Sequence, residues 1–138
     1  MKGINSSVLV IDDDPGVRRS YARLLERAGF SVTVVESGSE AYEELRKQSF
    51  GAIVLDIQMP SLTGLSFYEQ LEERLPGMAA RVVFVSGFID LPGTREFLTK
   101  TGRPFLAKPP DTEELVDVVR RVVEDAAQSG VKPESGES

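Results

Sequence analysis

Residues 8–15 read Val-Leu-Val-Ile-Asp-Asp-Asp-Pro, a short apolar run that ends in three carboxylates and a proline. Four consecutive apolar residues, three of them β-branched, are typical of a strand that is buried on both faces of a parallel sheet. The apolar residues that follow, Val17, Tyr21, Leu24, Leu25 and Ala28, lie on one helical face. The stretch therefore predicts a strand followed by a helix, with acidic side chains at the turn between them.

Short apolar runs and longer amphipathic segments continue to alternate along the chain, which predicts an α/β fold with a parallel sheet. The expected strands cover residues 8–11, 31–35, 52–55, 82–85 and 104–107. Apolar residues spaced three or four apart predict five helices, four between the strands and one after the last strand. The fourth is expected to be short, over residues 94–101, because Pro92 and Gly93 delay its start and Gly102 ends it.

Local signals place the ends of several of these helices. Ser37 and Glu40 have the spacing of a capping box, and Asp111 is expected to cap the last helix. Gly29 stands where a helix ends in a left-handed residue. The apolar positions of the third helix are Leu65, Tyr68, Leu71 and Leu75.

Composition limits the class of protein. The 138 residues suit one domain, expected over 1–127, and the polar segment 128–138 is expected to be a disordered tail. A formal charge of −6 without a basic patch argues against direct nucleic-acid binding. There is no signal-peptide pattern and no run of eighteen apolar residues, so we expect a cytoplasmic protein without membrane contact. The absence of Cys and His excludes thiolate chemistry and zinc sites built from these residues.

Polar side chains follow four of the five expected strands: Asp12 to Asp14, Asp56, Ser86 and Lys108. Because ligands of an open parallel sheet bind beyond the carboxyl ends of its strands, these side chains are expected to meet. Carboxylates within ~4 Å of each other repel by a few kcal/mol, so the cluster needs a cation or a shared proton. Mg²⁺ is favoured over Ca²⁺, which takes more ligands, and a lysine and a hydroxyl beside it suit phosphoryl oxygens.

With these residues the chain resembles the receiver domain of two-component response regulators. The resemblance covers about residues 8–127 and includes Asp12-Asp13, Asp56 followed by Met59-Pro60, Ser86, and Lys108-Pro109. It implies a single doubly wound, flavodoxin-like sheet with strand order 2-1-3-4-5, flanked by the five helices. It also implies a cis Lys108-Pro109 bond.

The resemblance assigns roles residue by residue. Asp56 would accept a phosphoryl group, and Ser86 and Lys108 would bind its oxygens. Asp13, Asp56 and the backbone carbonyl of Gln58 would ligate Mg²⁺, with Asp12 acting mainly through water. The chain would catalyse only its own phosphorylation and dephosphorylation and would otherwise be a signalling module.

The resemblance also implies a switch and partners. Movement of Ser86 toward the phosphate would draw Phe105 inward, although Phe105 lacks the hydroxyl of the tyrosine that is common at this position. The donor would be a sensor histidine kinase or a histidine phosphotransfer protein. A downstream protein would read the surface formed by residues 94–101, 104–107 and 112–127, with self-association through that surface left open. The sequence does not decide whether this is a stand-alone chain or a part of a hybrid kinase.

Two other functions compete with this one. A Mg²⁺-dependent phosphatase of the haloacid dehalogenase type would use Asp12 as its nucleophile, since Asp12-Asp13-Asp14 contains the Asp-x-Asp pattern. That family needs a further acidic pair on a later strand, which the sequence lacks. A degenerate receiver that serves only as a docking scaffold would not need the intact set of Asp56, Ser86 and Lys108.

Overall fold

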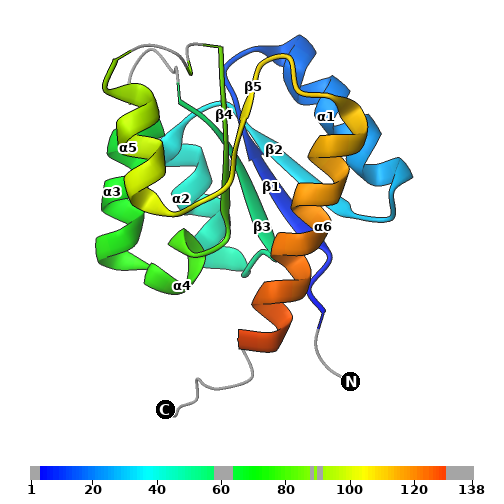
Figure 1. The fold of residues 1–138 in the computed structure, drawn as a ribbon. Coiled ribbons are helices and arrows are strands. Elements are labelled where there is room, and N and C mark those ends of the chain that lie inside the picture. The colour runs from blue at the N-terminus through cyan, green and yellow to red at the C-terminus, as the bar shows by residue number, and fades with distance from the viewer. Residues whose placement is uncertain (1–3, 58–63, 88, 90–91, 130–138) are drawn as a thin grey trace.

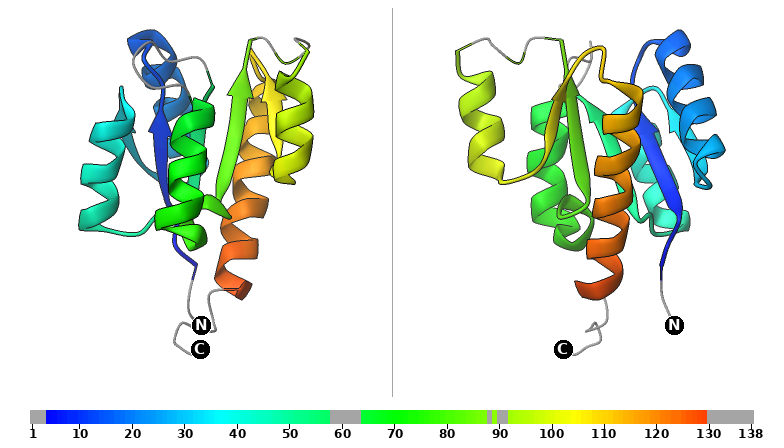
Figure 2. Two further views of the ribbon diagram at one scale, coloured as in Figure 1. Left: turned by 90° about the vertical axis from the view of Figure 1, so that its left-hand side faces the viewer. Right: turned by 45° about the vertical axis from the view of Figure 1, so that its right-hand side comes forward.

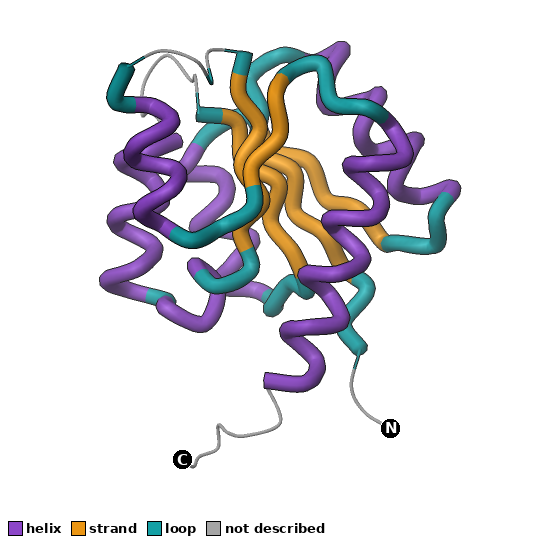
Figure 3. Tube along the Cα trace, viewed as in Figure 1, coloured by secondary structure: helices purple, strands orange, loops and turns teal. Residues whose placement is uncertain are grey.

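The fold is a parallel five-stranded sheet with helices on both faces, seen in a computed structural model that describes residues 4–57, 64–87, 89 and 92–129 (Figure 1). The strand order is β2-β1-β3-β4-β5, which confirms the predicted order, and Figure 3 shows the strands side by side at the centre. The strands are β1 (Ser7–Ile11), β2 (Ser31–Val35), β3 (Ala52–Asp56), β4 (Val82–Ser86) and β5 (Phe105–Ala107).

β3 and β4 end one residue later than the sequence predicted, β1 begins one residue earlier at Ser7, and β5 begins one residue later at Phe105. Asp56 pairs in register with Val85 at the end of β3, and Ser86 pairs with Ala107 at the end of β4. Both polar residues are therefore part of the hydrogen-bonded sheet and not of the loops that follow. Their backbone positions are fixed by the sheet, which is where a functional group is held most rigidly.

Helices cover the sheet in two layers (Figure 2). One layer contains α1 and α6, and the other contains α2, α3 and α5. The helices are α1 (Pro15–Arg27), α2 (Gly38–Lys47), α3 (Gly64–Arg74), α4 (Pro76–Ala79), α5 (Thr94–Thr101) and α6 (Thr112–Ser129).

The short helix α4 was not predicted, and it corrects both the number of helices and one core position. The sequence indicated five helices, with Leu75 on the buried face of the third. Instead α3 ends at Arg74, Pro76 starts a new four-residue helix, and Leu75 is 38% exposed. Proline explains the break, because it cannot supply the N–H group that continues a helix and it fits the first turn of the next one.

The strands divide their side chains between two cores. On β1, Leu9 and Ile11 pack with the layer of α2, α3 and α5, whereas Val8 and Val10 pack with the layer of α1 and α6. All four side chains are 0% exposed. This period of two is the geometry of a strand, and full burial of each side chain is worth about 1.5–3 kcal/mol.

The predicted caps are present, with one difference. Asp111 accepts a hydrogen bond from the Glu114 amide at 3.1 Å, and Ser37 accepts one from the Glu40 amide at 3.2 Å. The Glu40 carboxylate accepts a hydrogen bond from the amide of Glu36 at 3.0 Å. In a capping box the donor would be the amide of Ser37, one residue later. The end of α5 at Gly102, in the left-handed region at φ 70°, also agrees with the prediction.

The C-terminal helix extends two residues beyond the predicted domain limit of 127, to Ser129. The rest of the predicted tail, residues 130–138, lies outside the described residues. Among the helices that the structure describes, none has the length and apolar character to cross a membrane.

Candidate functional site

Three carboxylates meet at the carboxyl edge of the sheet. Asp12 follows β1, Asp13 is next to it, and Asp56 ends the neighbouring strand β3; one carboxylate oxygen from each lies within 4.8 Å of the others. Asp12 and Asp56 are only 1% and 3% exposed, whereas Asp13 faces solvent. The predicted acidic cluster is thus assembled, with two members buried and one accessible.

Lys108 supplies the positive charge of the cluster. Its Nζ donates to Asp12 Oδ2 at 2.9 Å and lies 3.4 Å from Asp56 Oδ2. Burial lowers the pKa of Lys108, but the hydrogen bond to Asp12 and the charges of Asp56 and Asp12 outweigh burial, so its pKa is raised. Lys108 therefore remains charged and bridges the two buried carboxylates.

A backbone hydrogen bond fixes the position of the Lys108 backbone. Its amide donates to the carbonyl of Ser86 at 2.9 Å, which joins the end of β5 to the end of β4. The Lys108-Pro109 peptide bond is cis, as predicted. Ser86 itself is 1% exposed. All four predicted strand-end groups, Asp12, Asp56, Ser86 and Lys108, therefore lie at one edge of the sheet.

Asp14 has a different role from its two acidic neighbours. Its Oδ1 accepts hydrogen bonds from the amides of Gly16 and Val17 at 2.8 and 3.3 Å, so it caps the N-terminus of α1. Its own amide donates to Asp12 Oδ1 at 2.9 Å and holds that carboxylate in place. Of the three consecutive acids, only Asp12 and Asp13 belong to the carboxylate cluster.

Arg18 is a site residue that the sequence did not reveal. Its guanidinium donates from Nη1 to the carbonyl of Asp12 at 2.8 Å, and Nη2 lies 3.8 Å from a carboxylate oxygen of Glu36. Arg18 therefore ties α1 to the end of β1 and to the residue after β2. An arginine six positions after an aspartate has no motif, so only the structure could identify it.

The start of α3 approaches the backbone of Asp56 very closely. The Gly64 amide donates to the carbonyl of Ile57 at 2.8 Å. A Cβ atom at Gly64 would overlap the carbonyl oxygen of Asp56 and would lie 2.7 Å from Ile57 Cα. Glycine is therefore required here by space.

We expect Gly64→Ala to lower the free energy of unfolding by about 1–3 kcal/mol, the usual cost of overpacking, and to slow phosphoryl uptake by displacing Asp56. The control is Gly51→Ala, whose Cβ would overlap the carbonyl of Asn5 at the opposite end of β3. It should destabilise the fold without changing phosphoryl uptake per folded molecule. Chemical denaturation and intact mass measure the two effects; equal loss of uptake in both variants would contradict the prediction.

The residues present fit Mg²⁺. Hard divalent cations prefer carboxylate oxygens, and three such oxygens lie close enough together to share one ion. Lys108 balances only part of the negative charge of Asp12, Asp13 and Asp56, so a dication would complete the neutralisation. The predicted carbonyl ligand, from Gln58, lies outside the described residues.

Phe105, the predicted switch residue, lies on β5 opposite Phe84 and packs against the core between the sheet and α5. Its side chain is partly exposed, and the guanidinium of Arg95 on α5 lies 5.9 Å from the centre of its ring. The ring therefore sits at the surface next to α5.

The doubly wound sheet and the acids and lysine at its carboxyl edge have the arrangement that the sequence predicted for a receiver domain. The family model of the response regulator receiver domain matches residues 8–120. The chain therefore belongs to the response regulator receiver domain family.

Curated relatives agree with this assignment. The chain is 28% identical over 116 residues to the response regulator receiver protein CpdR of Brucella abortus, covering 84% of this chain and 95% of that protein. It is 34% identical over 119 residues to the response regulator Rre1 of Synechocystis, covering 85% of this chain and 51% of Rre1. For the response regulator TodT of Pseudomonas putida the identity is 29%, with 53% of that protein covered. The chain thus spans about half the length of several curated relatives.

Solved structures show the same fold. The receiver domain dimer of NtrC4 superimposes with a TM-score of 0.78 at 27% identity, over 88% of this chain and 98% of that one. A CheY-like receiver domain from Methanospirillum hungatei has a TM-score of 0.80 at 22% identity, over 90% of this chain and 98% of that one.

Membership of this family makes the chain a receiver domain of two-component signalling, a phosphoacceptor module and not a conventional enzyme. Receiver domains of the family bind Mg²⁺ at an acidic cluster and interact with histidine kinases or phosphotransfer proteins. The comparisons favour this function over the haloacid-dehalogenase-type phosphatase. A degenerate receiver would match the same family, so only the phosphorylation test decides against the docking scaffold.

Proposed function

We propose that Asp56 is the phosphoacceptor, with Lys108 and Ser86 as the groups that bind the transferred phosphoryl oxygens. The observation that carries this assignment is the position of Asp56, which ends the central strand β3 beside Ser86 of β4 and has its Oδ2 3.4 Å from Lys108 Nζ. This contact places a permanent cation beside the carboxylate. Asp56 is also the acid next to Ser86, since β3 and β4 are paired neighbours.

In the proposed transfer, a carboxylate oxygen of Asp56 attacks the phosphorus atom of a phosphohistidine on the donor. A P–O bond forms as the P–N bond breaks, and the departing imidazole nitrogen keeps the electron pair. Asp12 and Asp13, together with Asp56, would hold Mg²⁺, which neutralises the negative charge that develops on the phosphoryl oxygens. Lys108 stabilises the same charge from the β5 side, and the hydroxyl of Ser86 donates to another oxygen.

The connection between β4 and β5 supports a route from the site to the surface. Ser86 is paired with Ala107, and its carbonyl accepts the amide of Lys108, so a shift of Ser86 is passed directly to β5. Phe105 is two residues back on that strand, under Arg95. We therefore assign Phe105 as the switch residue and the surface formed by α5, β5 and α6 as the one read by a downstream protein. The solved NtrC4 receiver domain is a dimer. Self-association of this chain is therefore measured together with its phosphorylation.

Magnesium dependence tests the proposed chemistry. The protein is incubated with acetyl phosphate, with Mg²⁺ or with EDTA, and its intact mass is measured. We expect the mass of one phosphoryl group to appear with Mg²⁺, and uptake to be at least about 100-fold slower with EDTA, because the carboxylates then repel the incoming phosphate. Uptake that is equal in EDTA would contradict the metal site. No uptake under either condition would favour the scaffold.

A further inference from the structure

The peptide unit between Asp12 and Asp13 connects the two acids of the cluster that follow β1. Because a peptide unit is planar and carries the Cα atoms of both residues, its orientation decides where the two carboxylates point. Asp12 is 1% exposed, whereas Asp13 faces solvent. A group that holds this peptide unit in place therefore also holds two of the three carboxylates of the cluster.

The sheet holds Asp12 through one backbone hydrogen bond to β2. The Asp12 amide donates to the carbonyl of Val35 at 3.2 Å. In a parallel ladder the amide and the carbonyl of one residue face the same neighbouring strand, so the Asp12 carbonyl also faces the β2 side. Because β2 ends at Val35, the strand supplies no further amide to this carbonyl.

Arg18 supplies a donor at this place. Its Nη1 donates to the Asp12 carbonyl at 2.8 Å, and its Nη2 lies 3.8 Å from a carboxylate oxygen of Glu36. The Arg18 side chain is 18% exposed, so the guanidinium group is largely enclosed. Buried backbone carbonyls are almost always hydrogen-bonded, and an unpaired one costs free energy. Arg18 thus continues the hydrogen bonding of Asp12 beyond the end of the ladder with β2.

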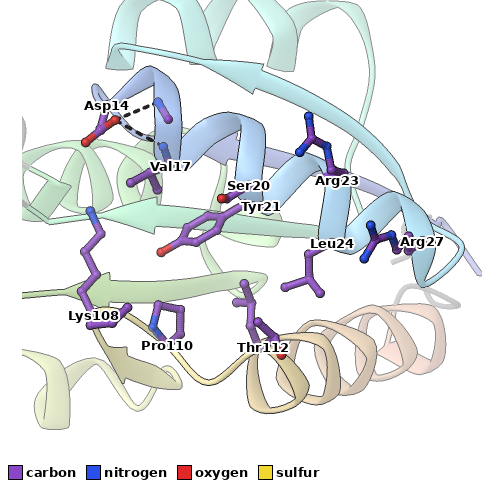
Figure 4. Close-up of a pocket in the computed structure, with 13 residues that line it drawn as sticks. Asp14, Val17, Ser20, Tyr21, Arg23, Leu24, Arg27, Lys108, Pro110 and Thr112 are labelled. Carbon is purple, nitrogen blue, oxygen red and sulfur yellow. Dashed lines mark hydrogen bonds between the residues drawn. The ribbon is translucent and has the colours of Figure 1, made fainter.

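The helix that carries Arg18 is fixed at its start. Asp14 accepts hydrogen bonds from the first amides of α1, as the dashed lines in Figure 4 show. On the next turns Val17, Tyr21 and Leu24 line the groove beside the segment that joins β5 to α6 (Figure 4). Arg18 follows Val17 and lies about 100° further round the helix, so it reaches the ends of β1 and β2 and does not line that groove.

We propose that Arg18 is a positioning residue for the magnesium site. Its hydrogen bond to the Asp12 carbonyl holds the peptide unit between Asp12 and Asp13 in the orientation in which both carboxylates face the ion. The inference rests on the proposed roles of these two acids in metal binding. Arg18 acts through the backbone and is not itself a ligand.

The charge of Arg18 has the opposite effect on metal binding. A positive group near three carboxylates repels a second cation, so its removal by itself would tighten Mg²⁺ binding. Loss of the hydrogen bond to the Asp12 carbonyl would weaken Mg²⁺ binding, because the two carboxylates would no longer be held together. The direction of the change in affinity therefore separates positioning from charge.

The first measurement is the Mg²⁺ affinity of the unphosphorylated proteins, followed by NMR of the backbone amides. We expect Arg18→Met to bind Mg²⁺ about tenfold more weakly than the wild type, the usual cost of losing a group that orients a metal ligand. Arg18→Lys, which keeps a donor for the Asp12 carbonyl, should recover part of the loss.

The matched control is Arg19→Met, which removes the same charge at an exposed neighbouring position of α1. It should bind Mg²⁺ at least as tightly as the wild type does. An affinity of Arg18→Met that equals or exceeds that of Arg19→Met would overturn the proposal.

Glu36→Gln separates the two contacts of Arg18. The Glu36 side chain is 61% exposed and lies 3.8 Å from the guanidinium group, and such surface ion pairs contribute little. We therefore expect the Mg²⁺ affinity of this variant to stay within about twofold of the wild-type value. A loss as large as that in Arg18→Met would assign the effect to the ion pair and would overturn the role of the carbonyl hydrogen bond.

Exchange of amide protons with water, measured by NMR in EDTA, tests the positioning without metal. The Asp14 amide donates to Asp12 Oδ1 at 2.9 Å, so it reports on the turn that carries the acids. In Arg18→Met this amide should exchange at least about threefold faster, whereas the amide of Phe84 in the middle of β4 should change little. Equal acceleration of both amides would show a general loss of stability and would overturn the proposal.

The dependence of phosphoryl uptake on Mg²⁺ completes the test. In Arg18→Met the loss of uptake from acetyl phosphate should be largest at limiting Mg²⁺ and should shrink as Mg²⁺ is raised. An equal loss at every Mg²⁺ concentration would overturn the proposal. If the wild type itself binds no Mg²⁺, the proposed metal site fails, and amide exchange in EDTA still decides whether Arg18 holds the turn.

Discussion

Replacement of Asp56 by Asn is expected to abolish phosphoryl uptake from acetyl phosphate, because the amide oxygen of Asn is a far poorer nucleophile than a carboxylate. Intact mass in the presence of Mg²⁺ measures the effect, which should be complete. The fold should be retained or slightly stabilised without metal, since one of three mutually repelling carboxylates is removed. Thermal unfolding in EDTA measures that second effect, and clear destabilisation would reveal a structural role for Asp56.

The matched control for this variant is Asp14→Asn. Asp14 is two residues from Asp12 in sequence but caps α1, and Asn is as good an N-cap as Asp. We therefore expect near wild-type uptake and stability. The phosphatase alternative is tested by Asp12→Asn: if Asp12 and not Asp56 is required, and phosphate is released over many turnovers, the roles of the acids are exchanged.

Removal of the positive charge at Lys108 is expected to have the second largest effect. Lys108→Met keeps the length of the side chain but leaves Asp12 and Asp56 without their shared cation. Phosphoryl uptake should slow by about 100-fold, the usual cost of losing one group that stabilises a developing oxyanion. In EDTA the free energy of unfolding should fall by about 2 kcal/mol, less than for a fully buried pair because the lysine side chain is 23% exposed.

Magnesium and pH separate this electrostatic effect from a packing defect. Mg²⁺ should restore much of the lost stability, since it neutralises the same carboxylates. In the wild type, the raised pKa of Lys108 means that its contribution is fully present below pH 10.5 and is lost as the pH rises through the raised value. Lys108→Met should therefore lose less stability on going to alkaline pH.

The control for Lys108→Met is Lys100→Met, an exposed lysine near the end of α5, which should change stability by no more than about 0.5 kcal/mol and leave uptake unchanged. If Lys108→Met is insensitive to Mg²⁺, the lost stability comes from packing and not from charge.

The sequence predicted the parts of this fold that depend on local patterns. Each strand is a short apolar run. The caps at Ser37 and Asp111 are local as well, because each side chain accepts a hydrogen bond from the amide three residues later. The break between α3 and α4 was missed because the periodicity of Leu65, Tyr68 and Leu71 continues through Leu75, while the effect of Pro76 depends on the backbone before it.

The candidate site divides in the same way. The convergence of Asp12, Asp56, Ser86 and Lys108 follows from one rule about the ends of parallel strands. The resemblance already set Asp14 apart from the pair of Asp12 and Asp13, but its role as the cap of α1 was not predicted and comes from the structure. The contacts of Arg18 depend on how α1 packs against the ends of β1 and β2, which no local pattern contains.

The contact between Lys108 and Asp12 joins residues that are 96 positions apart. It can form only when β5 is docked beside β4, since Lys108 directly follows β5. Fragments that lack β5, and nascent chains that have not yet emerged in full, will therefore have the acids without their cation. Because Lys108 is proposed to stabilise the transferred phosphoryl group, fragments that lack β5 should take up phosphate more slowly than the complete domain.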